Sequence, residues 1–237
     1  MINAATVGET LAAAFTDLAP ALRSWFGWLL AFAAMLLVYG IAGGGWTLGA
    51  SPGPPSPLQA ALTFGIAIPV SIATTVFSVA AAVRRVQPSF RMTPGRAVAF
   101  VGWSFGTAVF IFLGMLALVL PGIYLAARIG LRPVILLLDD SGENALTRTF
   151  RATGKAFFPT LLLWLSVWLV ELPFSLLLVF IAFKVPSTAP AAKIAASFGA
   201  NLVSIAVTQF SYAAQVRWSS ILLDADQRND WVSQLER

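Results

Sequence analysis

Two arginines stand inside one of the most apolar parts of this 237-residue chain. Arg128 and Arg132 follow Tyr124 at steps of four residues, so a helix would place the three side chains on one face. A guanidinium costs roughly 2.5 to 3.5 kcal/mol at the centre of a membrane, even on lenient insertion scales. The spacing indicates either recognition of an anion, for example a lipid phosphate, or structural pairing with Glu171 and with freed backbone carbonyls.

Glu171 is the acid that we expect to pair with Arg128. At 1.5 Å per residue, Arg128 would lie roughly 9 Å below the outer membrane surface and Glu171 roughly 8 Å below it. The two helices are consecutive in the chain, and consecutive elements are usually neighbours in space. The sequence therefore predicts an ion pair within the membrane, and leaves Arg132 to carbonyls, polar side chains or a bound phosphate.

A second group of basic residues follows the helix that carries the two arginines. Residues 141–155 contain Arg148, Arg151 and Lys155 beside apolar side chains such as Leu146. Basic side chains at a membrane surface attract anionic lipid headgroups, each contributing about 1 kcal/mol. We therefore predict a basic helix lying on the membrane and binding lipid through these three charges.

Polar side chains recur at helical spacing in the last apolar stretch. Steps of three and four residues place them on one face of a helix, which lipid would penalise. This face either packs against other helices or lines a cavity. We also expect Arg217, next to this face near its end, to be a polar residue within the membrane. The stripe consists of Asn201, Ser204, Thr208, Ser211, Gln215 and Ser219.

The composition indicates a helical membrane protein. Hydrophobic residues make up 58% of the chain and charged residues only 11%, whereas about a quarter of a soluble protein is charged. The apolar runs are continuous, which disfavours a β-barrel. The chain has no Cys and no His, which excludes disulfides, thiol nucleophiles and imidazole catalysis. We expect no catalytic residues, no metal and no cofactor, and no motif predicts a nucleic-acid partner.

Hydropathy predicts about six transmembrane helices in one integral membrane domain, residues 1–237. Pro121 and Gly122 are expected to turn the chain at the outer face, and Pro133 to bend the helix that follows. Residues 1–22 are predicted to form a helix on the membrane surface, capped by Thr6 and Glu9. The predicted spans are 25–42, 58–83, 97–120, 123–138, 156–183 and 194–216.

The distribution of basic residues predicts the orientation. The loops 84–96 and 139–155 hold seven Lys and Arg, whereas the loops on the other side hold two. Because cytoplasmic loops are enriched in these residues, we expect both termini in the cytoplasm of a bacterial cell, with the chain in the inner membrane.

A weak internal repeat accompanies this layout. Residues 77–84, Phe-Ser-Val-Ala-Ala-Ala-Val-Arg, return as Phe-Ser-Tyr-Ala-Ala-Gln-Val-Arg at 210–217, and Tyr124 to Arg128 echo them. Each copy closes a hairpin that starts near Thr6, Thr93 or Asp140. The interpretation is three units, each a surface helix followed by two spans, with chance similarity between Ala-rich segments as the alternative.

One run of motifs resembles a known family. It consists of Pro-Gly, a helix with an arginine, an acidic residue at the end of that helix, then Ala-Leu-x-Arg and a glycine. This run resembles the membrane domain that lies beside the catalytic barrel in some glycerophosphoryl diester phosphodiesterases, and the stand-alone bacterial relatives of that domain. Residues 94–170 carry the resemblance, and the rest of the chain follows it only in hydropathy. The resemblance implies a six-helix inner-membrane domain, and the chain has no room for the barrel, so its activity is not implied. The motif residues are Pro121, Gly122, Arg128, Asp139, Ala145, Leu146, Arg148 and Gly154.

Together these observations predict an all-α, non-enzymatic protein of the bacterial inner membrane. We expect it to bind or move phospholipid, or to support membrane homeostasis, with membrane phospholipids as its partners. Two alternatives remain open at this point: a transporter of small molecules or ions through a polar cavity, and an assembly or immunity-type partner of another membrane protein. The sequence leaves the oligomeric state open.

Overall fold

The computed structural model describes residues 2–24, 68–117, 119–139, 144–184 and 190–235, with the isolated residues 57, 61 and 65. Every element in these ranges is a helix, which confirms the predicted all-α class. The helices are α1 (Ala4–Ser24), α4 (Ile68–Val86), α5 (Pro94–Ala117), α6 (Val119–Ile129), α7 (Arg132–Leu138), α8 (Ala145–Gly154), α9 (Phe157–Lys184) and α10 (Pro190–Leu235).

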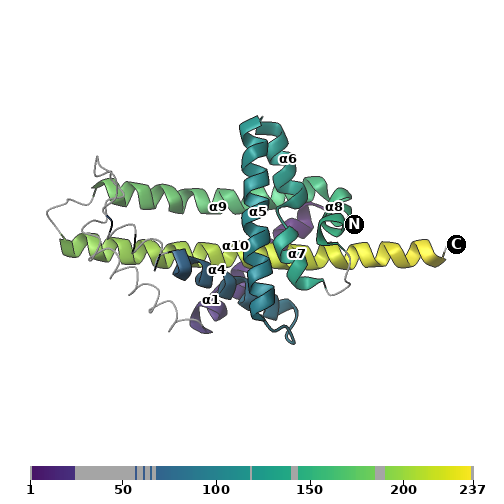
Figure 1. Ribbon diagram of the computed structural model, residues 1–237, viewed down its shortest axis with the longest axis horizontal. Coiled ribbons are helices and arrows are strands. Elements are labelled where there is room, and N and C mark those ends of the chain that lie inside the picture. The colour runs from purple at the N-terminus through teal and green to yellow at the C-terminus, as the bar shows by residue number, and fades with distance from the viewer. Residues whose placement is uncertain are drawn as a thin grey trace.

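The antiparallel pair of α9 and α10 forms the long axis of the molecule (Figure 1). Helices α1 and α4 pack against α10, and the short helices α7 and α8 lie near the end where α9 begins. The hairpin of α5 and α6 runs transverse to this axis. Buried side chains fill the region where these directions meet, among them Phe100, Leu131, Leu163 and Trp218. The indole of Trp218 donates a buried hydrogen bond of 3.0 Å to the hydroxyl of Thr160, which joins α10 to α9.

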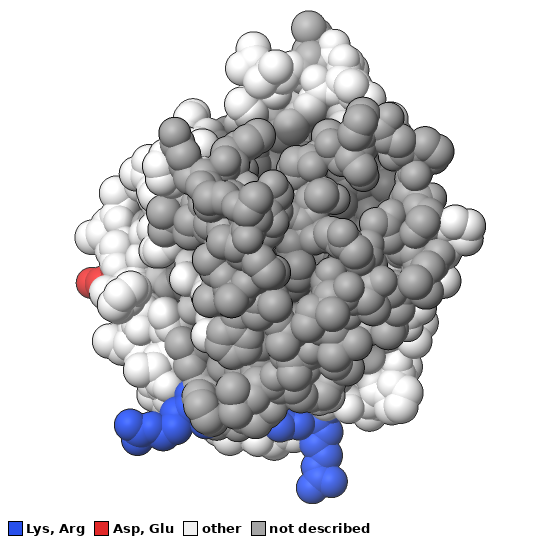
Figure 2. Space-filling model, turned by 90° about the vertical axis from the view of Figure 1, so that its left-hand side faces the viewer, with Lys and Arg blue, Asp and Glu red and all other residues white. Residues whose placement is uncertain are grey.

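Four stretches of the described helices are long and apolar enough to cross a membrane, so the chain is a helical membrane protein. The predicted first span, residues 25–42, lies outside the described residues. Seen along α9 and α10 from the end where α10 begins, the described surface is largely uncharged, with basic side chains along its lower edge (Figure 2). The four stretches are Ile68–Val86, Pro94–Ala117, Val119–Leu138 and Phe157–Phe174.

The first helix forms as predicted, but its start and its surroundings differ from the prediction. Asn3 is the capping residue: its carboxamide oxygen accepts the backbone N–H of Thr6 at 3.1 Å, and its own N–H donates to the Thr6 hydroxyl at 3.4 Å. The predicted cap of Thr6 and Glu9 is therefore wrong by one turn. Val7 and Ala14 are buried in the core, because α1 packs along α10 instead of resting on lipid with its whole apolar face.

The hairpin of α5 and α6 turns just before Pro121, which lies in the first turn of α6. Proline is tolerated there because the first N–H groups of a helix have no intrahelical acceptor. Gly122 then faces α5 so closely that a Cβ atom would stand 2.7 Å from the backbone nitrogen of Met115. Gly114 meets Gly122 in the same contact, so glycines rather than larger side chains close this hairpin.

The break between α6 and α7 confirms the bend predicted near Pro133. Helix α6 ends at Ile129 and α7 starts at Arg132, with Pro133 in its first turn. Gly130 lies at the break, where a Cβ atom would come within 2.8 Å of the Trp164 ring.

The three-unit repeat is wrong for the middle of the chain. Helix α5 begins directly at Pro94, capped by the Thr93 hydroxyl as predicted, and only residues 87–93 separate it from α4. Seven residues leave no room for a surface helix. The two similar segments nevertheless belong to helices that pack together, since Gln209 of α10 donates to the carbonyl oxygen of Ser78 in α4 at 3.4 Å.

Candidate functional site at the charged end

Charged side chains of the described residues gather where α9 begins and where α10 continues past Arg217. We call this region, with α8, the charged end; it includes Lys155, Arg217, Asp226 and Arg228. Most of the residues predicted to bind lipid lie here, although their partners differ from those expected.

Arg128 leaves α6 beside α8. Its Nε donates to the Tyr124 hydroxyl at 3.2 Å and its Nη1 donates to the carbonyl oxygen of Phe150 at 3.1 Å. The guanidinium also lies over the rings of Tyr124 and Phe150, at 5.7 and 5.2 Å from their centroids. The predicted shared face of Tyr124 and Arg128 is therefore confirmed, and backbone and rings surround the charge.

The predicted ion pair between Arg128 and Glu171 is wrong. Glu171 accepts a hydrogen bond from the Ser211 hydroxyl of α10, and no ion pair joins it to Arg128 in the described structure. The physical reason is depth. Arg128 lies beside α8 at the charged end, whereas Glu171 is fourteen residues into α9, about 21 Å along it at 1.5 Å per residue.

Arg132 has an aromatic partner. Its guanidinium carbon lies 3.4 Å from the centroid of the Trp103 ring of α5. Its Nε is buried without a hydrogen-bond acceptor, and no acid pairs with it among the described residues. A cation over an indole face is stabilised by the quadrupole of the ring, which gives this arginine a partner that carries no charge.

Arg148 is buried and does not reach the lipid surface, so its predicted role in headgroup binding is wrong. Its Nη1 lies 2.8 Å from the Asp139 carboxylate, and the side chains are only 5% and 8% exposed. Helix α8 is capped by Asn144, and the face that carries Arg148 turns toward α7. Arg151 lies on a more exposed face, and its Nε contacts the buried Asp226 carboxylate of α10 at 2.9 Å.

The motif behind the family resemblance assembles around α8. Gly122 closes the α5–α6 hairpin, Asp139 pairs with Arg148, and Arg128 packs on Gly154. A Cβ atom at position 154 would stand 2.9 Å from Nη1 of Arg128, so glycine leaves room for the guanidinium. These residues join α6, α7 and α8, which is a structural role.

An open cleft of about 740 Å³ lies between α1, α8 and α10 at the charged end. Arg151, Lys155 and Arg228 supply positive charge to it and Asp226 supplies the acid, while Ile2 and Leu222 are among its apolar lining. Arg228 donates to the carbonyl oxygen of Asp224, and Lys155 is exposed; neither has an ion-pair partner among the described residues. The cleft therefore combines basic groups with apolar surface.

In the described part of α10, other helices enclose the predicted polar stripe only in part, and Ser204 is exposed. Ser211 binds Glu171, Ser219 is buried, Thr208 and Gln215 are half-buried, and the side chain of Asn201 lies outside the described part. Arg217, predicted to lie within the membrane, donates to Asp17 of α1 through Nε and Nη2, at 2.8 and 2.6 Å, which places it at the charged end.

Sequence reasoning missed Asp17, Asp226, Arg228 and Trp103. Asp17 and Arg217 stand 200 residues apart, and no spacing rule connects residues so distant. Asp226 and Arg228 read as solvated positions of a polar tail, because nothing in the tail shows which side faces α8.

Comparison with known proteins found no matching family model, no similar curated protein and no similar solved structure. The fold and the site define a helical membrane protein with a basic, partly apolar cleft at one end.

Proposed function

We propose that this protein binds anionic phospholipid in the cleft between α1, α8 and α10, in a bacterial inner membrane, without a catalytic step. The observation that carries the proposal is the lining of the cleft, in which Arg151, Lys155 and Arg228 face a single acid. Asp226 neutralises Arg151, so Lys155 and Arg228 remain to attract a phosphate.

The position of the cleft supports a lipid ligand over a soluble anion. Lys155 precedes Phe157, the first residue of the apolar helix α9, by two positions, so it belongs at the level of the headgroups. The next residue after Phe157, Phe158, is exposed. The phosphate of a phospholipid can contact the basic groups while its acyl chains contact the apolar surface of α9. A free anion can contact the basic groups alone.

A transport path has less support. Ser211 of the predicted polar stripe bonds to Glu171 of α9, and Gln209 bonds to the backbone of α4. The resemblance of residues 94–170 to the membrane domain of glycerophosphoryl diester phosphodiesterases agrees with an inner-membrane location and adds no activity.

The test replaces both basic residues of the cleft that have no ion-pair partner in the described part of the chain, as Lys155→Gln with Arg228→Gln. Each basic residue contributes about 1 kcal/mol, so the double variant should lose roughly thirty-fold in affinity for phosphatidylglycerol. Native mass spectrometry of the purified protein, titrated with phosphatidylglycerol or phosphatidylcholine, measures this loss. Arg151 stays unchanged, because its removal would leave Asp226 buried without its partner.

Arg91→Gln is the matched control, since Arg91 is an exposed arginine in the loop between α4 and α5, away from the cleft. It should leave the affinity for phosphatidylglycerol unchanged. If the control and the double variant lose the same affinity for phosphatidylglycerol, the binding depends on overall positive charge and not on the cleft. If neither variant loses affinity, the cleft is not a lipid site.

A further inference from the structure

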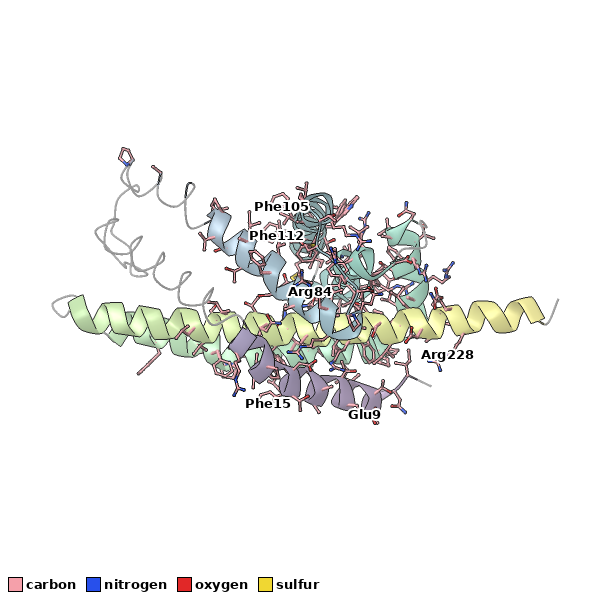
Figure 3. The ribbon with its side chains drawn as sticks, turned by 90° about the horizontal axis from the view of Figure 1, so that it is seen from below. Glu9, Phe15, Arg84, Phe105, Phe112 and Arg228 are labelled. Atoms are coloured by element: carbon pink, nitrogen blue, oxygen red, sulfur yellow. The ribbon has the colours of Figure 1, made fainter. Side chains whose placement is uncertain are left out.

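The hairpin of α5 and α6 does not follow the direction of the α9–α10 pair. Figure 1 shows α5 running across the pair, and Figure 3 shows α5 end-on, with Phe105 and Phe112, while α9 and α10 extend lengthwise. Helix α9 has 28 residues, so it is about 42 Å long and can cross the roughly 30 Å core of a bilayer. A planar bilayer has one normal, so helices that lie across each other cannot both cross it.

Two contacts place the part of α6 from Tyr124 to Arg128 at the charged end. The ring of Tyr124 lies 5.6 Å from the ring of Phe157, which is the first residue of α9. One turn later, Arg128 donates to Phe150 of α8. Had the chain turned at the outer face near Pro121, Tyr124 would lie far from the start of α9.

The chain after the break stays at the same level. Arg128 contacts one part of α8 and Asp139 binds Arg148 of the same helix, although eleven residues separate Arg128 from Asp139. Helix α8 has ten residues, about 15 Å. The carbonyl oxygen of Leu138, at the end of α7, accepts a hydrogen bond from Gln87, the first residue after α4. This segment therefore makes no progress toward the other side of the membrane.

Helix α5 is close to the charged end as well. Phe100 packs edge-on against Tyr212, with ring centroids 6.1 Å apart, and Tyr212 precedes Arg217 by five residues, about 7.5 Å along α10. Trp103 lies under Arg132. Elsewhere α5 is open: Val98 and Phe105 are each 73% exposed and Phe112 is 61% exposed. An apolar surface this extensive needs a cover, and acyl chains supply it.

We infer that α5 and α6 form an in-plane hairpin, embedded along its length in the leaflet on the side of the charged end, with the acyl chains of that leaflet as its partner. The hairpin does not cross the bilayer. In this arrangement Arg128 and Arg132 stay near the headgroups, so neither guanidinium has the free-energy cost of lying at the centre of the membrane. The inference rests on helix directions and contacts, and is independent of lipid binding in the cleft.

Depth measurements test it, because the chain has no cysteine and accepts single spin labels. Val98, Phe105 and Phe112 stand seven residues apart on one face of α5, and each is exposed. After labelling of Val98→Cys, Phe105→Cys and Phe112→Cys in phosphatidylglycerol–phosphatidylcholine vesicles, the accessibility of each label to oxygen and to a nickel chelate gives its depth. We expect one common depth within the leaflet on the side of the charged end.

Leu162, Leu169 and Leu176 of α9 supply a matched series, exposed and equally spaced. Labels there should shift in depth by roughly 10 Å per step, at 1.5 Å per residue. A similar gradient along α5 would overturn the inference. Leu120→Cys adds a second readout for any label that disturbs folding: near the hairpin turn it should resist an impermeant maleimide from both sides of the membrane. Reaction at the face opposite a Ser89→Cys reference would also overturn it.

Discussion

Arg128, Arg132 and Arg148 differ in the groups that surround them. Arg148 has a carboxylate and is buried, Arg128 has a carbonyl and two rings, and Arg132 has only the Trp103 ring among the described residues. A buried charge tolerates the loss of its partner poorly, because the desolvation that the partner offset then remains. An exposed pair gives up far less, since water replaces the partner.

Asp139→Asn should therefore lower the free energy of unfolding by about 3 kcal/mol, since it removes the carboxylate charge beside the buried guanidinium of Arg148. Unfolding in detergent micelles by titration with sodium dodecyl sulfate, followed by tryptophan fluorescence, measures the change. Combining it with Arg148→Met should recover part of the loss.

Asp17→Asn removes the same charge from a pair whose arginine is 33% exposed, so it should cost less than about 1 kcal/mol. Comparable losses at positions 17 and 139 would contradict the burial argument.

At the scale of the helices, glycines decide where the chain can fold back. A Cβ atom at Gly122 meets the backbone of Met115, which cannot move without separating α5 from α6, whereas a Cβ atom at Gly102 meets nothing within 4 Å. The same substitution should thus have opposite effects at the two positions.

Gly122→Ala should destabilise the protein by about 1 to 3 kcal/mol through overpacking. Gly102→Ala should stabilise it by about 0.5 to 1 kcal/mol, because alanine loses less backbone entropy within a helix. The same unfolding titration compares the two variants. A neutral result at position 122 would mean that the hairpin opens at little cost.

Several helix boundaries could be predicted because their causes are local. Thr93 and Pro94 start α5 and Pro133 restarts the chain after α6, as expected from cap and proline chemistry. The cap of α1 lies one turn earlier than predicted, because Asn3 fits the same role as Thr6. Local sequence patterns predict a helix and its ends, but they do not predict which other elements it packs against. They therefore do not show that Arg148 faces inward or that the α5–α6 hairpin lies across α9.

For the whole molecule, the basic loops and the charged end point to the same side of the membrane. Ser89 is exposed in the loop between α4 and α5, and the positive-inside rule predicts a cytoplasmic position for this loop. Ser89→Cys should react with an impermeant maleimide only after the inner membrane is permeabilised. Phe180→Cys, exposed near the other end of α9, is expected to react no faster after permeabilisation. Labelling of Ser89→Cys in intact spheroplasts would show that the orientation is opposite to the predicted one.

The contact between Asp17 and Arg217 also has a consequence for biosynthesis. Helix α1 leaves the ribosome before α10, and its partner arginine is 200 residues further along the chain. At 5 to 20 residues per second, the interval is roughly 10 to 40 s. During that time α10, which packs along α1 in the folded protein, is not yet available to the apolar face around Val7 and Ala14. The native packing of α1 can therefore be completed only after α10 has been synthesised.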